Sequence, residues 1–92
     1  MITGETLLRR ADGALATSTT DGNLVLLDRD YEYLRLNETA SRIWELLEQP
    51  QTADELVAVL TEEFGITSEV CRAGLLPVVE TFLQRGLIVL AP

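Results

Sequence analysis

The chain of 92 residues contains no histidine and no lysine, and Cys71 is its only cysteine. The absence of histidine removes the commonest metal ligand and the commonest general base, and a single cysteine cannot form an internal disulfide. The net charge of −8 would repel phosphate backbones, so we expect no nucleic-acid partner.

Long apolar runs are also missing. No stretch approaches the ~18 residues that a membrane helix needs, and the start, MITGETLLRRADG, lacks the charged-then-apolar pattern of a signal peptide. We therefore expect no membrane association and a cytoplasmic protein. The length predicts a single domain over residues 1–92, and a hydrophobic content of 47% suits one packed core rather than a disordered chain.

The stretch ALATSTTDGNLVLLDRDYEYLRLN predicts an antiparallel meander. Asp21-Gly22 favours a type I′ hairpin turn, which requires positive φ at both central residues. A second tight turn is expected near Arg29-Asp30, and the apolar centre LVLL is long enough for burial on both faces. The predicted strands are 14–19, 23–28 and 31–36.

Three helices are expected after the meander, so the fold class is α+β, with the helices forming a bundle. Asn37 suits the N-cap of the first helix, TADE is a capping box in which Thr52 caps and Glu55 reaches back, and Gly65 suits the end of the second helix. The apolar stripes are Ala40, Ile43, Trp44 and Leu47 on the first helix, and Leu56, Val59, Leu60 and Phe64 on the second. Trp44 at this spacing favours a core position over a ligand platform.

The third helix should run from Thr67 or Ser68 to about Arg85. Pro77 lies inside it, where proline removes a backbone donor and crowds the carbonyl of Ala73. Because the apolar phase continues across Pro77, we expect one kinked helix rather than two pieces. The closing LIVLAP is either a short strand or a tail.

No catalytic pattern emerges from the residues. The acids Asp54, Glu55, Glu62 and Glu63 favour a solvated helix face over a paired-carboxylate site. Cys71 lies on an apolar stripe with no histidine to activate it, which favours a buried structural thiol. We therefore expect a protein that is not an enzyme and that has no catalytic residues, metal or cofactor.

The third predicted strand is an edge of the meander. It has no proline or glycine, and Glu32 and Arg35 are its only charges. Such an edge is either protected by those charges or used for β-augmentation by an extended peptide. Its outer face, with Tyr31 and Tyr33, could be covered by the N-terminal Leu7 and Leu8 or could meet a partner.

The third helix is apolar over more than one stripe, which suggests contacts on two sides. Gly74 costs ~1 kcal/mol relative to alanine, and it either permits close approach of another backbone or accompanies the bend at Pro77. The residues expected to line a groove beside the third strand are Val70, Cys71, Gly74 and Val78.

The order of these segments, VLLD, then LNETASRIWELL, then TADELVAVLTEEFGI and a closing RGLI, resembles the PqqD-like family over Leu15 to Ile88. Its members include coenzyme PQQ synthesis protein D and the small recognition proteins of lasso-peptide biosynthesis. The resemblance implies a winged-helix-like, non-catalytic unit that binds the leader of a ribosomally made precursor peptide. The peptide would pair with the third strand and lie against the third helix, contacting Tyr31, Glu32, Tyr33, Leu34, Arg35 and the four groove residues of the helix.

The resemblance also implies processing partners. In lasso systems these are a cysteine leader peptidase and a macrolactam synthetase, and ALATSTTDGNLVLLD resembles the first hairpin of that type. In PQQ synthesis the partner is a radical SAM enzyme. Two other functions remain possible. The first is a winged-helix DNA-binding regulator, because GITS joins two helices as in a helix-turn-helix. The second is an accessory subunit that docks an enzyme without binding peptide. A monomer or an edge-mediated dimer is expected.

Overall fold

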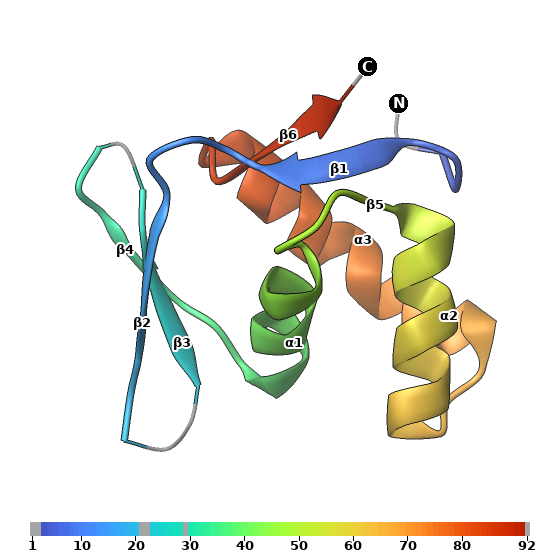
Figure 1. Cartoon of the computed structure of the whole chain (residues 1–92). Helices are drawn as coiled ribbons and strands as arrows, with labels where there is room; N and C mark the ends of the chain where they lie inside the picture. Colours follow the sequence, from blue (N-terminus) through green and yellow to red (C-terminus); the bar gives the residue numbers. More distant parts are fainter. Residues whose placement is uncertain (1–2, 21–22, 29, 92) are drawn as a thin grey trace.

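The computed structural model describes residues 3–20, 23–28 and 30–91, and within them the chain has an α+β fold. Two antiparallel sheets of three strands, β5-β1-β6 and β2-β3-β4, border the helices. Figure 1 shows β2-β3-β4 along one side of the helices and β1 crossing above them. The elements are β1 Leu7–Arg10, β2 Leu15–Ser18, β3 Leu24–Leu27, β4 Tyr33–Arg35, α1 Glu38–Leu46, β5 Gln51–Thr52, α2 Ala53–Phe64, α3 Ser68–Gln84 and β6 Ile88–Ala91.

The predicted meander is confirmed as β2-β3-β4, with β3 in the centre. The third strand is shorter than predicted, because Tyr31 has a φ of 62° and belongs to the preceding turn rather than to β4. The expectation that LVLL is buried on both faces is wrong: Leu26 is fully buried, whereas the outward Val25 and Leu27 are only half-buried. The turn residues Asp21, Gly22 and Arg29 lie outside the described part of the chain.

The second sheet was largely missed by the sequence analysis. In β1, Leu8 is completely buried and pairs with Leu90 of β6 and Gln51 of β5. The closing segment is therefore a strand rather than a tail. The N-terminal leucines belong to this sheet, so the expectation that they could cover Tyr31 and Tyr33 is wrong.

The helix ends follow the predicted capping residues. Asn37 Oδ1 accepts a hydrogen bond from the Ala40 N–H at 2.8 Å, and the capping box of Thr52 and Glu55 closes with bonds of 3.1 and 2.9 Å. Gly65 ends α2 with a φ of 63°. The third helix is a single element, as predicted, since α3 continues through Pro77; the kink at Pro77 stays a prediction.

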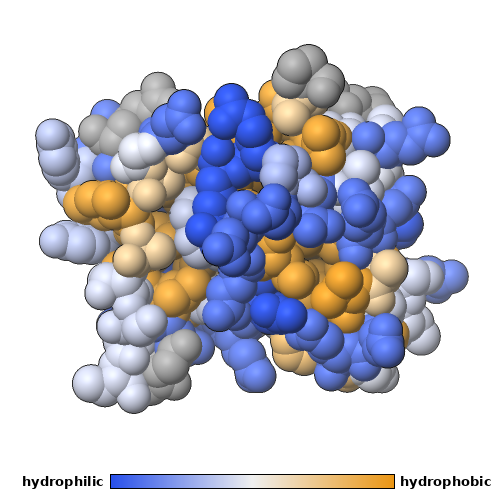
Figure 2. All heavy atoms as spheres, viewed as in Figure 1, coloured by the Kyte–Doolittle hydropathy of each residue, from blue (hydrophilic) through white to orange (hydrophobic). Residues whose placement is uncertain are grey.

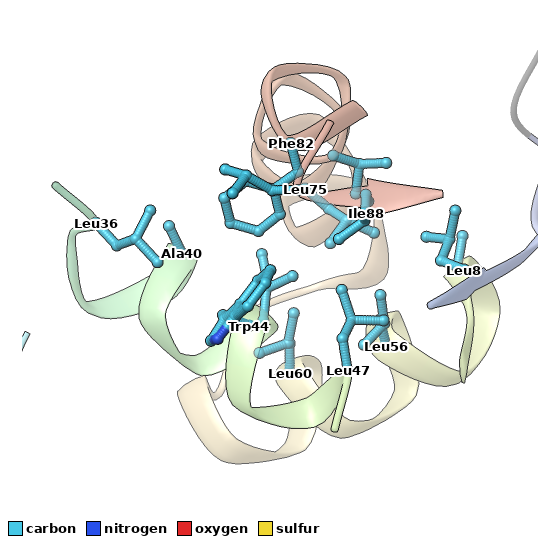
Figure 3. Packing of buried hydrophobic residues seen from close by; sticks show 14 of the residues in the cluster. Leu8, Leu36, Ala40, Trp44, Leu47, Leu56, Leu60, Leu75, Phe82 and Ile88 are labelled. Atoms are coloured by element: carbon cyan, nitrogen blue, oxygen red, sulfur yellow. The ribbon is translucent and has the colours of Figure 1, made fainter. Parts of the chain in front are cut away.

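The core lies between the three helices and the β5-β1-β6 sheet, and Leu26 of β3 and Leu36 after β4 also belong to it. Figure 3 shows residues of the three helices together with Leu8 of β1 and Ile88 of β6. Trp44 of α1 meets Phe82 of α3 edge to face, with ring centroids 5.8 Å apart, and Arg10 of β1 lies over the Trp44 ring at 4.6 Å. Trp44 is therefore a core residue, as its spacing predicted. On α2 the stripe is shifted, because Val57 is buried and Val59 is only half-buried.

The surface is divided by polarity. Figure 2 shows a band of hydrophilic residues across the middle of one face, with apolar residues on either side of it, over the β2-β3-β4 sheet and over the helices. No helix in the described residues is long and apolar enough to cross a membrane.

Candidate functional site

The backbone of β4 presents two residues to the outside of its sheet. The Asp28 N–H donates to the Glu32 carbonyl at 3.0 Å, and the Leu36 N–H donates to the Leu24 carbonyl at 2.9 Å. Because bonded positions alternate along an antiparallel strand, the N–H and C=O groups of Tyr33 and Arg35 point away from β3. β4 is the outer strand of its sheet, so within the described residues these groups have no strand partner.

The two faces of β4 differ in their surroundings. Leu34 is half-buried against the helices and Leu36 is 5% exposed, whereas Tyr33 on the opposite face is 71% exposed. Tyr31, in the turn, is 83% exposed. A chain arriving at this edge would therefore meet a core-facing side and an open, partly aromatic side.

A groove of about 220 Å³ lies between β4 and α3. Its floor is apolar, with Leu34, Leu36 and Phe82, and Val78 stands on the α3 side. The volume of this groove is below the ~300–1,000 Å³ of typical small-molecule pockets. The groove borders β4, whose outward backbone groups are at the edge of the sheet. The remaining lining residues are Arg35, Asn37, Ala40, Pro77 and Thr81.

A buried carboxylate holds the β3–β4 turn to the end of α3. Asp28 Oδ1 accepts hydrogen bonds from the backbone N–H groups of Asp30 at 2.9 Å and Glu32 at 3.0 Å. Its Oδ2 pairs with Arg85 at 3.5 Å, and Arg85 also reaches Glu32 at 3.7 Å. Because Arg85 caps α3, this network fixes one end of the groove.

Replacing Asp28 by alanine is expected to destabilise the fold by about 2 kcal/mol, because two turn N–H groups lose their acceptor and Arg85 loses its buried partner. Urea unfolding followed by circular dichroism measures the change. Glu32→Gln is the matched control: its carboxylate is 70% exposed, so it should stay within about 0.5 kcal/mol of wild type. Equal costs for the two variants would contradict this role of Asp28.

A second hollow, of about 370 Å³, lies along the N-terminal half of α3. Val70, Cys71 and Gly74 line it together with residues of α1 and α2 and do not line the groove beside β4. Their contact with a peptide stays a prediction. The N-terminal half of α3 packs against α2, and only its C-terminal half reaches β4. Of the four helix residues, Val78 alone lines the groove. The other lining residues of the second hollow are Thr39, Leu60, Phe64, Ile66 and Leu75.

Sequence reasoning did not identify Pro77, Thr81 and Phe82 as groove residues. They lie within one turn of Val78, so helical spacing from Val78 would have indicated them. The missing information was which half of α3 lies beside β4, and that is set by the packing of the whole domain.

Steric crowding does not explain why position 74 is a glycine, since a Cβ added there would meet no atom of the described chain within 4 Å. Gly74→Ala is therefore expected to stabilise the domain by about 1 kcal/mol through helix propensity, raising Tm by ~4–8 °C. Ala73→Gly, at the exposed neighbouring position, is the matched control and should lower Tm by a similar amount. A destabilised Gly74→Ala variant would contradict the absence of a packing role.

Cys71 is 4% exposed, and burial raises the pKa of its thiol despite the neighbouring Arg72. A raised pKa leaves less thiolate at a given pH, and thiolate is the reactive form. We therefore expect the folded protein at pH 8 to react with iodoacetamide far more slowly than the urea-unfolded chain, as followed by mass spectrometry. Equal rates would show that the thiol is accessible.

Two of the acids on α2, Asp54 and Glu63, form ion pairs, and Glu55 belongs to the capping box. Glu63 accepts a bidentate bond from Arg42, with two contacts of 2.7 Å, and this contact lowers the pKa of the Glu63 carboxyl. Asp54 pairs with Arg72. Arg72 of α3 and Arg85, which caps that helix, are thus both engaged by carboxylates. No cluster of three potential metal-ligating side chains is found in the described ranges.

Comparison with known proteins identifies a family and a similar fold. Residues 23–88 match the family described as coenzyme PQQ synthesis protein D (PqqD). The fold is similar to the solution NMR structure of the PqqD truncation of Methylobacterium extorquens PqqCD, described as a functional, stand-alone RiPP recognition element. The TM-score is 0.81 at 17% identity, over 97% of this chain and 95% of that one. No curated protein matches the chain significantly.

Proposed function

The chain belongs to the PqqD family, and from this premise we propose that it binds the leader segment of a ribosomally synthesised precursor peptide. The leader pairs as an added strand with β4 and places side chains in the groove against α3. The domain contributes no catalysis of its own and presents the rest of the precursor to maturation enzymes.

The observation that carries this proposal is the outward backbone of Tyr33 and Arg35 beside an apolar groove. Main-chain bonds to a sheet edge supply affinity for an extended peptide, and pockets for alternate side chains supply specificity. No proline or glycine interrupts β4, so nothing in the strand blocks this pairing.

The peptide can also extend beyond β4. Val78, Gly74 and Val70 are four residues apart, so they follow one side of α3 from the groove to the second hollow. A leader that continues along this side contacts Gly74 and the exposed Val70, with Cys71 beneath. At the other end, Tyr31 and Glu32 flank the start of β4 and are the remaining contacts in the proposal.

The processing partners in this proposal are those of lasso-peptide biosynthesis, a leader peptidase and a macrolactam synthetase. The similarity of the first hairpin to that type is the supporting observation. A radical SAM partner, as in PQQ synthesis, is the alternative within the same family. The enzymes encoded beside this chain distinguish the two, because the first case requires a peptidase and a synthetase and the second a radical SAM enzyme.

A binding titration tests the proposal. A short peptide encoded near the gene of this chain serves as the candidate precursor; its leader and core halves are labelled with fluorescein, and their anisotropy is measured with increasing protein. We expect saturable binding of the leader and none of the core. Absence of leader binding would contradict the proposal, and salt-dependent binding of a 20-base-pair duplex would favour a DNA-binding regulator instead.

A further inference from the structure

We propose that Arg35 selects peptides in which an acidic residue stands directly beside an apolar residue. The acid lies opposite Arg35 on the open face of the extended sheet, and the apolar neighbour points into the groove against α3. This inference rests on the proposed peptide-binding function and adds to it the chemical class of the ligand.

The first observation is that Arg35 has no side-chain partner among the residues that the structure describes. Five of the other arginines are engaged: Arg9 with Asp12, Arg10 with the Trp44 carbonyl, Arg42 with Glu63, Arg72 with Asp54 and Arg85 with Asp28. Arg35 forms no ion pair or side-chain hydrogen bond within the described residues. In a chain with 15 acidic and 7 basic side chains, an arginine that is unpaired within the described residues is unusual, and this one stands on β4 at the border of the groove.

The second observation is the position of Arg35 in the sheet. Arg35 is paired with Val25 on β3, and Val25 is in turn paired with Thr17 on β2. The row that contains Arg35 therefore holds no carboxylate. On the free side, an added strand would place one side chain directly opposite Arg35, with Cβ atoms ~4.5–5.5 Å apart, close enough for an ion pair.

The third observation concerns the next position of the added strand. Side chains alternate between faces, so the residue beside the acid faces the same side as Leu34. That side is the groove, where Val78 and the buried Phe82 offer apolar surface. A peptide with an acidic residue next to an apolar one can therefore pair its acid with Arg35 on the open face and place its apolar side chain in the groove.

The surrounding charges do not oppose an acid at this point. Glu32, three residues before Arg35 and just ahead of β4, is paired with Arg85. The acids of α3, Glu69 and Glu80, lie about 180–200° around the helix from Val78 at 100° per residue, so they face away from the groove. Repulsion from the remaining negative charge is largely screened beyond ~8 Å at physiological ionic strength.

The test is a selection from a random library of 12-residue peptides against the full chain. It is performed in parallel with the Arg35→Gln, Arg35→Glu and Arg9→Glu variants, whose folding is checked by unfolding curves. Arg9→Glu is the matched charge control, because Arg9 does not line the groove and its side chain makes only exposed contacts, a 3.9 Å pair with Asp12 and a 3.3 Å hydrogen bond to the Arg10 carbonyl. Enriched peptides are mapped by amide shifts at Tyr33 and Arg35.

We expect wild type and Arg9→Glu to enrich an acidic residue beside an apolar one, Arg35→Glu to enrich a basic residue there, and Arg35→Gln to lose the preference. Individual acidic peptides should bind Arg35→Gln about threefold more weakly than wild type. Peptides that map to β4 without this preference would overturn the role of Arg35 and leave the proposed function standing. A selection with no peptide at β4 would overturn both.

Discussion

Tyr33→Pro is expected to weaken leader binding about tenfold while the domain remains folded. The N–H of Tyr33 points to the free side of β4, so proline there removes no bond of the β3–β4 ladder. It does remove one donor from the added strand and places a ring in its path, and a loss of ~1.4 kcal/mol corresponds to a factor of ten. Anisotropy titration with labelled leader gives the affinity, and circular dichroism reports the fold.

The matched control is Ser18→Pro on β2, the other outer strand of the same sheet. The Thr19 N–H donates to the Asn23 carbonyl at 2.8 Å, so by alternation the N–H of Ser18 also points outward. This variant should bind the leader with wild-type affinity. If Ser18→Pro lost binding and Tyr33→Pro kept it, the peptide would pair with β2 rather than with β4.

Trp44→Ala is expected to destabilise the fold by ~3–5 kcal/mol, which is the usual cost of removing a large buried aromatic side chain. Trp44 is 3% exposed and contacts the Phe82 ring and the Arg10 guanidinium. Since small domains are stable by only ~5–15 kcal/mol, much of the total stability depends on this contact. Urea unfolding followed by circular dichroism measures the loss.

Leu76→Ala is the control for this cost, because Leu76 lies on α3 but is 42% exposed. It should destabilise the domain by less than about 1 kcal/mol. The milder Trp44→Phe keeps a buried ring and should fall between the two. A Trp44→Ala cost as small as that of Leu76→Ala would place the centre of the core elsewhere.

The parts of the fold that the sequence predicted depend on local signals. Asn37, Thr52 and Gly65 act through their own backbone neighbours, so their roles as caps could be read from residue type and spacing. The meander likewise follows from alternation and turn residues within one continuous stretch. The edge position of the third strand followed from this order alone.

The missed parts depend on contacts that are distant in the sequence. β1 pairs with β6, about eighty residues later, and with the two-residue β5, and neither short segment carries a strand pattern strong enough to be recognised alone. Tyr31 was assigned to a strand because alternation continued through it, but the carboxylate of Asp28 organises a turn there. The groove residues of α3 could not be chosen without knowing which end of the helix meets β4.

Amide hydrogen exchange of the free and leader-bound protein tests the central claim most directly. On binding, we expect the exchange of the Tyr33 and Arg35 amides to slow, because their outward N–H groups gain partners. The Leu34 amide, already directed to β3, should change little, and the outward amides of Ala16 and Ser18 on β2 should not change. Unchanged exchange at Tyr33 and Arg35 in the saturated complex would contradict strand addition at β4.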